Sequence, residues 1–463
     1  MRDGVTRRNF VRGAGVAAGA ALAGCTGSSG SDSSGTGSSG NDSSGNESSG
    51  QRPVKYLGIL PYAFEEEVNK FEDYAGWDLS VKTTSLSSVT TEILGGGAQT
   101  YDMAGGDATV IKALQEGNAL HEVPVNRLDR WEEDKIADVL TKPQERLDYL
   151  GDQAKQLSEL LWADASKKEK LALAPVVFGH DSVASNPKKV DPSTEKEWSI
   201  LFDDRFNGRS MVTTNAIIGA SEVLMHLLDN DMIEGEQSTI NQPTEEQIDA
   251  VVDFLVKQKD AGQFRKLWTS SGTSTNLLAN EEVYVGDPWQ VGVMQCRRKG
   301  TPCQYNTLVG GVQGYRFWVS STHPTKPGAT QRNNLDEVYK WLNELKYGAW
   351  YPGFVHSQVG YGTPNYANEE LVRSGSDQIG EGMGPEFYDW AFRGKKTYKT
   401  IEEPFLFDPA EYEWSMEEGS PASDGKPRDE GSISLRNDRI GYFQLYPENG
   451  DYLLEQWKQF TSA

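Results

Sequence analysis

The chain has 463 residues, with 68 acidic residues against 45 Lys and Arg, so its formal net charge at pH 7 is −23. This balance argues against nucleic-acid binding, because contact with phosphates requires a basic face. The acidic residues are spread along the chain, which indicates a halophilic, salt-adapted surface and makes a single carboxylate weak support for a functional site. Residues 53–463 are long enough for two domains.

The N-terminus has the order of an export signal. Arg7 and Arg8 are followed by a polar, an aromatic and an aliphatic residue, as in the twin-arginine signal. The uncharged run at 13–24 is too short and too weakly apolar to span a bilayer, which takes about 20 apolar residues. It ends in Leu-Ala-Gly before Cys25, a pattern at which a peptidase cuts and the thiol takes a lipid. We therefore expect residues 1–24 to be a twin-arginine lipoprotein signal peptide, and Cys25 to anchor the exported protein to the outer face of the cell membrane.

A linker follows the lipidation site. Residues 26–50 contain only Ser, Gly, Thr, Asn, Asp and Glu, so they have no apolar side chain to bury. We expect 25–52 to be disordered, with a span of roughly 25–30 Å that holds a globular body clear of the membrane. Asn41 and Asn46 each begin a glycosylation sequon, and the sequence leaves open whether either is used.

Beyond residue 53, short apolar strands alternate with segments of helical spacing. Strands are expected at 54–60, 79–84, 101–104, 172–178, 198–202, 208–213, 282–285, 304–308 and 315–319. Helices are expected at 64–74, 89–94, 110–116, 143–162, 219–229, 291–298, 335–345 and 452–460. A further helix begins at Thr244, which forms a capping box with Gln247. Residues 419–431 are polar and indicate a loop.

This alternation predicts an α/β fold with mostly parallel, doubly wound sheets. Two α/β halves joined by extended crossings would leave a cleft between them. Open sheets of this kind bind ligands beyond the carboxyl ends of their strands. The sequence therefore predicts a ligand site between two lobes.

No motif for catalysis, metal binding or phosphate binding is present in the sequence. The five His residues form no His-x-x-x-His pair and there is no Cys-x-x-Cys. The glycines at 95–97 and 105–106 lack the Lys and Ser/Thr of a phosphate-binding loop, and there is no Gly-x-Ser-x-Gly elbow. We therefore expect no metal, no cofactor and no enzymatic activity. Cys296 and Cys303 either close a disulfide across the turn between them or remain two small buried thiols.

Four segments carry a family resemblance. They read AQTYDM at 98–103 with LQEGNAL at 114–120, WSILFD at 198–203 with GR at 208–209, EVYVGDPW at 282–289, and YGTPN at 361–365. In this order, behind a lipoprotein signal, residues 53–400 resemble the spermidine/putrescine-binding family among the solute-binding proteins of ABC importers. The resemblance implies a periplasmic binding protein of type 2, a monomer with two α/β lobes that close around a small solute and deliver it to a membrane permease. We expect lobe 1 at 53–177 and 316–463, and lobe 2 at 178–315.

Matching by position transfers the family's pocket onto this chain. Tyr62 falls on an aromatic of the first lobe's pocket and Trp289 on one of the second lobe's, and such faces suit an ammonium group through cation–π contact. The family's two acidic positions fall on Asn215 and Ile218, and its small hydroxyl falls on Asp107. The pocket implied for this chain therefore departs from that of a simple polyamine binder.

The family's remaining carboxylate falls on Arg316, which would repel an ammonium group. Arg316 with Asp107 would instead suit a zwitterion or a solute bearing a carboxylate or phosphonate, with the guanidinium as the anion clamp. Asp287 could restore acidity, and it shares a face with Trp289 if that stretch is extended. Phe178 and Tyr361 lie where the chain should cross between lobes and complete the candidate ligand-binding set.

Each candidate also has a plainer interpretation. Arg316 could form a surface salt bridge, Asp107 and Asp287 could be solvated carboxylates, and Tyr62 and Trp289 could be core aromatics. For the whole protein, the alternatives to a lipid-anchored solute receptor are a secreted, lipid-anchored enzyme and a structural surface protein on a glycosylated stalk. The lack of catalytic motifs argues against the enzyme, and the lack of internal repeats argues against the surface protein.

Overall fold

The computed structural model describes residues 53–59, 63–191, 195–394 and 431–462, and it divides the chain into two compact units, 1–53 and 54–463. The expected signal peptide with Arg7 and Arg8, the lipidated Cys25, the linker and Tyr62 lie outside the described residues, as does the expected loop up to residue 430. The unit at 54–463 contains two large sheets and one two-stranded ladder among the described residues.

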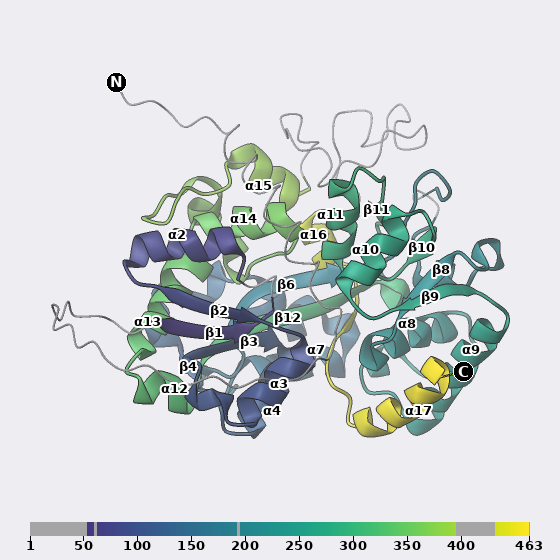
Figure 1. Ribbon diagram of the computed structural model, residues 1–463, viewed down its shortest axis with the longest axis horizontal. Coiled ribbons are helices and arrows are strands. Elements are labelled where there is room, and N and C mark those ends of the chain that lie inside the picture. Colours follow the sequence, from purple (N-terminus) through teal and green to yellow (C-terminus); the bar gives the residue numbers. More distant parts are fainter. Residues whose placement is uncertain (1–52, 60–62, 192–194, 395–430, 463) are drawn as a thin grey trace, which may run out of the picture. The chain divides into compact units, whose positions relative to one another are not determined.

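The first lobe is built on a six-stranded sheet with the strand order β13-β12-β3-β1-β2, in which β6 also pairs with β12 (Figure 1). Its strands are β1 Val54–Gly58, β2 Leu79–Thr83, β3 Met103–Asp107, β6 Pro175–Asp181, β12 Tyr315–Pro324 and β13 Ile440–Phe443. β1 runs parallel to β2 and β3, whereas β12 runs antiparallel to β3 and β6 and parallel to β13. The sheet is therefore mixed, with a parallel part where strands alternate with helices.

Helices of the first lobe cover this sheet (Figure 1). They are α2 Glu65–Ala75, α3 Leu86–Leu94, α4 Ala108–Glu116, α5 Asp138–Thr141, α6 Pro143–Arg146, α7 Asp152–Leu161, α12 Lys326–Gln331, α13 Leu335–Lys340, α14 Trp350–Val359, α15 Pro385–Ala391 and α16 Ile433–Asn437, with two π-helical segments, η10 Trp341–Lys346 and η12 Glu370–Ser374. A small ladder joins β4 Val123–Pro124 to β5 Lys170–Leu171. The 3₁₀ helices in the part of the chain that the structure describes are η2 Gly97–Gln99, η3 Val125–Arg127, η4 Glu133–Lys135, η5 Asp148–Leu150, η6 Trp198–Phe202, η7 Asp204–Phe206, η8 Gln237–Thr239, η9 Gly311–Gln313 and η11 Pro364–Ala367.

The second lobe has a five-stranded sheet with the order β11-β7-β10-β8-β9. Its strands are β7 Ala184–Ser185, β8 Ser210–Thr213, β9 Phe264–Trp268, β10 Val285–Gly286 and β11 Gln304–Tyr305. Its helices are α8 Ala216–Asp229, α9 Glu245–Asp260, α10 Ser271–Ala279, α11 Gln290–Arg298 and α17 Gly450–Ser462. α9 begins with the expected capping box, in which Gln247 N donates to Thr244 Oγ1 and Thr244 N donates to Gln247 Oε1.

The structure differs from the expected lobe boundaries in two places. β6 continues to Asp181 in the first sheet, because its last residues pair with the start of β12. α17 packs against α8 and α9 of the second lobe rather than on the first, with Trp457 and Phe460 buried among their apolar residues. Within the described residues, the chain therefore crosses between the two large sheets three times: after β6, before β12 and after β13.

Two expected elements also take another form. The segment expected as one helix at 143–162 is broken into α6, η5 and α7, because Gly151 has a φ of +54° where α7 begins. The apolar run at Trp198–Phe202 is a buried 3₁₀ helix instead of a strand. Its indole is fixed by a hydrogen bond of 2.9 Å from Trp198 Nε1 to Gly314 O. A short apolar run fits either form, so its periodicity could not decide between them.

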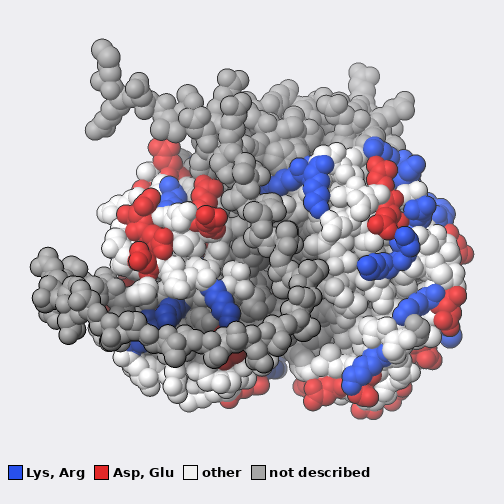
Figure 2. All heavy atoms as spheres, viewed as in Figure 1, with Lys and Arg blue, Asp and Glu red and all other residues white. Residues whose placement is uncertain are grey.

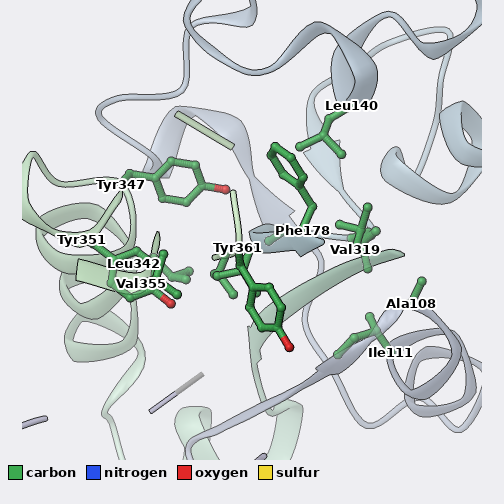
Figure 3. Packing of buried hydrophobic residues seen from close by; sticks show 14 of the residues in the cluster. Ala108, Ile111, Leu140, Phe178, Val319, Leu342, Tyr347, Tyr351, Val355 and Tyr361 are labelled. Atoms are coloured by element: carbon green, nitrogen blue, oxygen red, sulfur yellow. The ribbon is translucent and has the colours of Figure 1, made fainter. Parts of the chain in front are cut away.

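The first lobe's main core runs along this sheet and its helices. Phe178 of β6 points toward Leu140, and Tyr347 and Tyr361 lie among the same buried apolar side chains (Figure 3). On the described surface seen in Figure 2, Lys and Arg side chains form separate groups beside Asp and Glu rather than one continuous basic area. Within the described residues, no helix has both the length and the apolar character needed to cross a bilayer.

Candidate functional site

Arg316, near the start of β12, is fully buried and its guanidinium donates to carboxylates of both lobes. Nη2 lies 2.8 Å and Nε 3.2 Å from Asp181 Oδ2, at the end of β6 in the first sheet. Nη1 donates to Oε1 of Glu222, on α8 of the second lobe. The two strands explain one half of this arrangement, because Arg316 and Asp181 are register partners on antiparallel β12 and β6. The bond to Glu222 connects the lobes.

Asp287 is the third buried carboxyl group of this cluster and follows β10 in the second lobe. Its Oδ2 accepts from Thr213 N at 2.9 Å, and its Oδ1 accepts from the indole Nε1 of Trp268 at 2.6 Å. Tyr305 Oη donates to Asp181 Oδ1 at 3.0 Å from β11. We refer to Asp181, Glu222, Asp287 and Arg316 as the junction cluster.

Burial dominates the electrostatics of the junction cluster. It raises the pKa of Glu222 well above its ordinary range, and the neighbouring Asp287 raises that pKa further. Burial also raises the pKa of Asp287, against hydrogen bonds that lower it. Burial by itself would lower the pKa of Arg316, but the carboxylates of Asp181 and Glu222 outweigh this and raise it well above its usual value. The guanidinium therefore stays charged, while Glu222 and Asp287 retain a proton at higher pH than exposed carboxyl groups do.

Three of the predicted site residues lie at or beside this cluster. Arg316 and Asp287 belong to it, and Trp289 packs edge-to-face on Trp268, the indole donor to Asp287, with ring centroids 5.2 Å apart. The surface salt bridge considered for Arg316 is wrong, because the side chain is fully buried. The solvated state considered for Asp287 is wrong for the same reason.

The hypothesis that Arg316 clamps an anionic solute meets a structural obstacle. Its Nε, Nη1 and Nη2 atoms already donate to Asp181 and Glu222, so its charge is matched inside the protein. An anion would have to compete with two carboxylates that are held in place. The repulsion that Arg316 would exert on a cationic solute is reduced for the same reason.

Asp107 and Asn215 serve as helix caps. Asp107 is buried at the start of α4, where its Oδ1 accepts from the backbone N of Thr109 and Val110, both at 3.1 Å, and its Oδ2 accepts from Gln444 Nε2 at 3.3 Å. The solvated carboxylate considered for it is therefore wrong. Asn215 is exposed and caps α8, where its Oδ1 accepts from the second and third backbone N–H groups of the helix at 3.1 and 3.3 Å. Their capping bonds explain these residue types without a ligand.

Phe178 and Tyr361 lie in the first lobe's apolar core. Phe178 forms a backbone bridge to Gly362, and Tyr361 packs edge-to-face on Trp318 with centroids 4.7 Å apart. Figure 3 shows both side chains among apolar neighbours. The segment at 361–365 is thus held beside β6 within the first lobe. The expectation that Phe178 and Tyr361 lie at crossings between the lobes is therefore wrong, and both side chains have packing roles.

Sequence reasoning missed Asp181 and Glu222. A signal was present for Glu222, which is the only acidic residue in the apolar run from Ala216 to Leu228. A charged residue within such a run is buried and needs a partner when the run forms a helix. Asp181 carried no comparable signal, since its role depends on the pairing of β6 with β12.

Other candidate chemistry is limited in the part of the chain that the structure describes. No group of three or more His, Cys, Asp and Glu side chains there is arranged to hold a metal ion. Cys296 and Cys303 are both buried free thiols in a small apolar cluster of the second lobe. This favours two small buried thiols over a disulfide for this pair.

Neither a protein-family model nor a curated protein matches this sequence. Solved structures do match it. A Listeria monocytogenes protein described as belonging to a spermidine/putrescine ABC transporter has a TM-score of 0.55 at 15% identity, over 89% of this chain and 98% of its own. The spermidine/putrescine substrate-binding protein PotD of Streptococcus pneumoniae has a TM-score of 0.53 at 14% identity, over 88% and 99%. The A. tumefaciens B6 protein MotA, in complex with glucopine, has a TM-score of 0.52 at 10% identity, over 88% and 99%.

This is the fold of the type 2 periplasmic binding proteins. The match covers nearly the full length of each of these structures, so both lobes are shared. Identities of 10–15% carry the fold alone, and the ligands differ among proteins that share it. These likenesses therefore establish the fold and assign no ligand to this chain.

Proposed function

We propose that this protein is the substrate-binding protein of an ABC importer. The observation that carries the proposal is the shared two-lobed fold, with a buried cluster of charged side chains where β6, β12 and the second lobe meet. Two lobes joined by short crossings can close around a solute by a hinge motion. Lipid attachment at Cys25 would keep such a receptor beside its permease, with the linker giving it reach.

We propose further that the solute carries a cationic group. The three carboxyl groups of the junction cluster outnumber its single guanidinium, so the region favours positive charge. Trp289, half-buried at the edge of this cluster, offers an aromatic face for an ammonium group. This set supports a polyamine or a zwitterion with an accessible ammonium group over a purely anionic solute.

Calorimetric titration of the purified protein with spermidine, a neutral amino acid and a phosphonate tests this proposal. We expect binding of solutes with an ammonium group, and a loss of about tenfold in affinity in Trp289→Ala, the scale of one cation–π contact. Trp131→Ala is the matched control, since Trp131 is also half-buried but packs on Trp162 and Tyr347 of the first lobe. Binding of the phosphonate alone would contradict the cationic assignment, and turnover of any ligand would contradict the receptor itself.

The anchor is tested separately. Labelling of expressing cells with a radioactive fatty acid should mark the protein, and Cys25→Ser should remove the label and release the protein from the membrane. Replacing Arg7 and Arg8 by Lys should hold the protein in the cytoplasm. A protein that keeps its membrane association without the Cys25 thiol is not lipid-anchored in the way proposed.

A further inference from the structure

The junction cluster has an unbalanced charge. It contains three carboxyl groups, from Asp181, Glu222 and Asp287, against one guanidinium, from Arg316, and all four side chains are buried. Unpaired charge in a protein interior is costly, so groups in this position neutralise instead of remaining ionised. With Arg316 charged, two of the three carboxylates would have no matching cation, so the cluster favours binding a proton.

The hydrogen bonds indicate which atom can hold that proton. Both oxygens of Asp287 accept from N–H groups, and Asp181 accepts from Arg316 and Tyr305. Glu222 Oε1 accepts from Arg316, but Glu222 Oε2 is buried without a hydrogen-bond partner among the described residues. Glu222 and Asp287 also interact directly through their side chains. A proton on Oε2 gives this atom a donor role toward the carboxylate of Asp287.

The groups that face Glu222 come from several elements. They are Asp181 from β6, Asp287 from the segment after β10, Arg316 from β12, and the tyrosine Tyr442 from β13, while Tyr305 of β11 adjoins Asp181. Burial raises the pKa of Tyr442, which therefore stays a neutral hydroxyl. Arg316 is thus the only cation among these groups, and it is shared by two carboxylates.

We propose that the junction cluster is a proton-gated latch between the lobes, which holds one proton between Glu222 and Asp287 while the lobes are joined and releases it when they separate. Separation exposes Glu222 to water, where the pKa of a glutamic acid is about 4.3, so the exposed group is ionised at neutral pH. The joined arrangement therefore binds the proton more tightly, so low pH favours joined lobes and high pH favours separated ones. For one proton, the equilibrium shifts by up to about tenfold per pH unit. The latch does not depend on the proposed transport function.

Pulsed electron paramagnetic resonance measures the distance between two spin labels, and with one label on each lobe it reports whether the lobes are joined or separated. The labels are attached to the full exported chain at Lys112→Cys on α4 and Asp253→Cys on α9, two exposed positions on different lobes. In the otherwise native protein, we expect the share of the longer distance to rise between pH 5 and pH 9. Glu222→Gln, which imitates the protonated acid, should keep the short distance throughout this range.

Glu245→Gln is the matched control, because it removes one acidic group from an exposed position at the start of α9. It should retain the pH dependence of the native chain. If Glu222→Gln fails to fold by circular dichroism, Asp287→Asn replaces it, since loss of the acceptor carboxylate should also flatten the response. A native chain with one unchanging distance between pH 5 and pH 9 overturns the latch, and so does an undiminished pH response in the folded cluster variants.

Discussion

Two of the buried charge sites among the described residues differ in their charge balance and in their position relative to the lobes. In the first lobe, Lys346 Nζ forms a salt bridge with Glu67 and donates a hydrogen bond of 2.9 Å to Tyr351 Oη. It also makes cation–π contacts with the rings of Trp341 and Tyr351. One acid faces one base, within one lobe. In the junction cluster, three acids face one base and the contacts extend from one lobe to the other. A matched pair inside one lobe stabilises the packing of that lobe, whereas the proposed latch couples proton binding at the unmatched set to the arrangement of the two lobes.

The largest expected effect comes from breaking the matched pair. Lys346→Met leaves Glu67 buried without its cation, and we expect a loss of about 3–5 kcal/mol in the free energy of unfolding. Urea denaturation measures this loss. The double variant Glu67→Leu/Lys346→Met should recover most of it, because both charges are then gone. A single variant as stable as the native chain would show that the pair is not buried as described.

A smaller loss is expected at the junction. Arg316→Met removes the guanidinium, but Glu222, whose pKa burial already raises, can take up a proton in its place, so we expect a loss of about 2 kcal/mol in the free energy of unfolding at neutral pH. The loss should shrink as the pH falls toward 5, because protonation of Glu222 then removes a buried negative charge. Urea titrations at several pH values measure this trend. A loss that grows at low pH would contradict an acidic cluster.

The pH dependence of Glu67 sharpens the contrast further. Burial raises the pKa of Glu67 to about 7 in the folded protein, although Lys346 opposes the shift. A raised pKa in the folded state means that the contribution of this group to stability is greatest below about pH 4.5 and is lost as the pH rises through 7. Glu67→Gln should flatten this part of the curve of unfolding free energy against pH. It should leave the inter-lobe distance unchanged, unlike Glu222→Gln.

The smallest expected effect comes from removing a helix cap, and it serves as the reference for the pH dependence of the other variants. Thr244→Ala removes the cap of α9, and we expect a cost of about 1 kcal/mol that stays constant from about pH 5 upward. The Thr244 side chain also helps to lower the pKa of Glu246, so the comparison is made where that carboxylate is ionised. The same urea series measures it. A pH-dependent cost at this position would mean that the pH trends of the Arg316 and Glu67 variants do not arise from the two buried charge sites.

The sequence predicted the secondary-structure elements and the residues of the candidate site to different extents. The start of α9 was predictable to within a residue, because the capping box of Thr244 and Gln247 is encoded locally. The helix α7 and the 3₁₀ turn at Trp198 were not, because Gly151 and a tertiary hydrogen bond decided their form. For the site, matching by position led to Trp289 and Arg316, and Asp287 was inferred from the face it would share with Trp289. The same matching assigned Arg316 the role of an anion clamp, which its bonds to Asp181 and Glu222 oppose.

The sequence by itself determined the alternating α/β pattern, the cap of α9 and the order of motifs that resemble a two-lobed solute-binding protein, because each of these is encoded over a few neighbouring residues. Only the tertiary structure decided what Arg316 does. Its partners Asp181 and Glu222 lie 135 and 94 residues away along the chain, and the β6–β12 register together with the packing of α8 brings them together. The charge of a buried side chain acquires its meaning from such distant partners, and no local pattern records them.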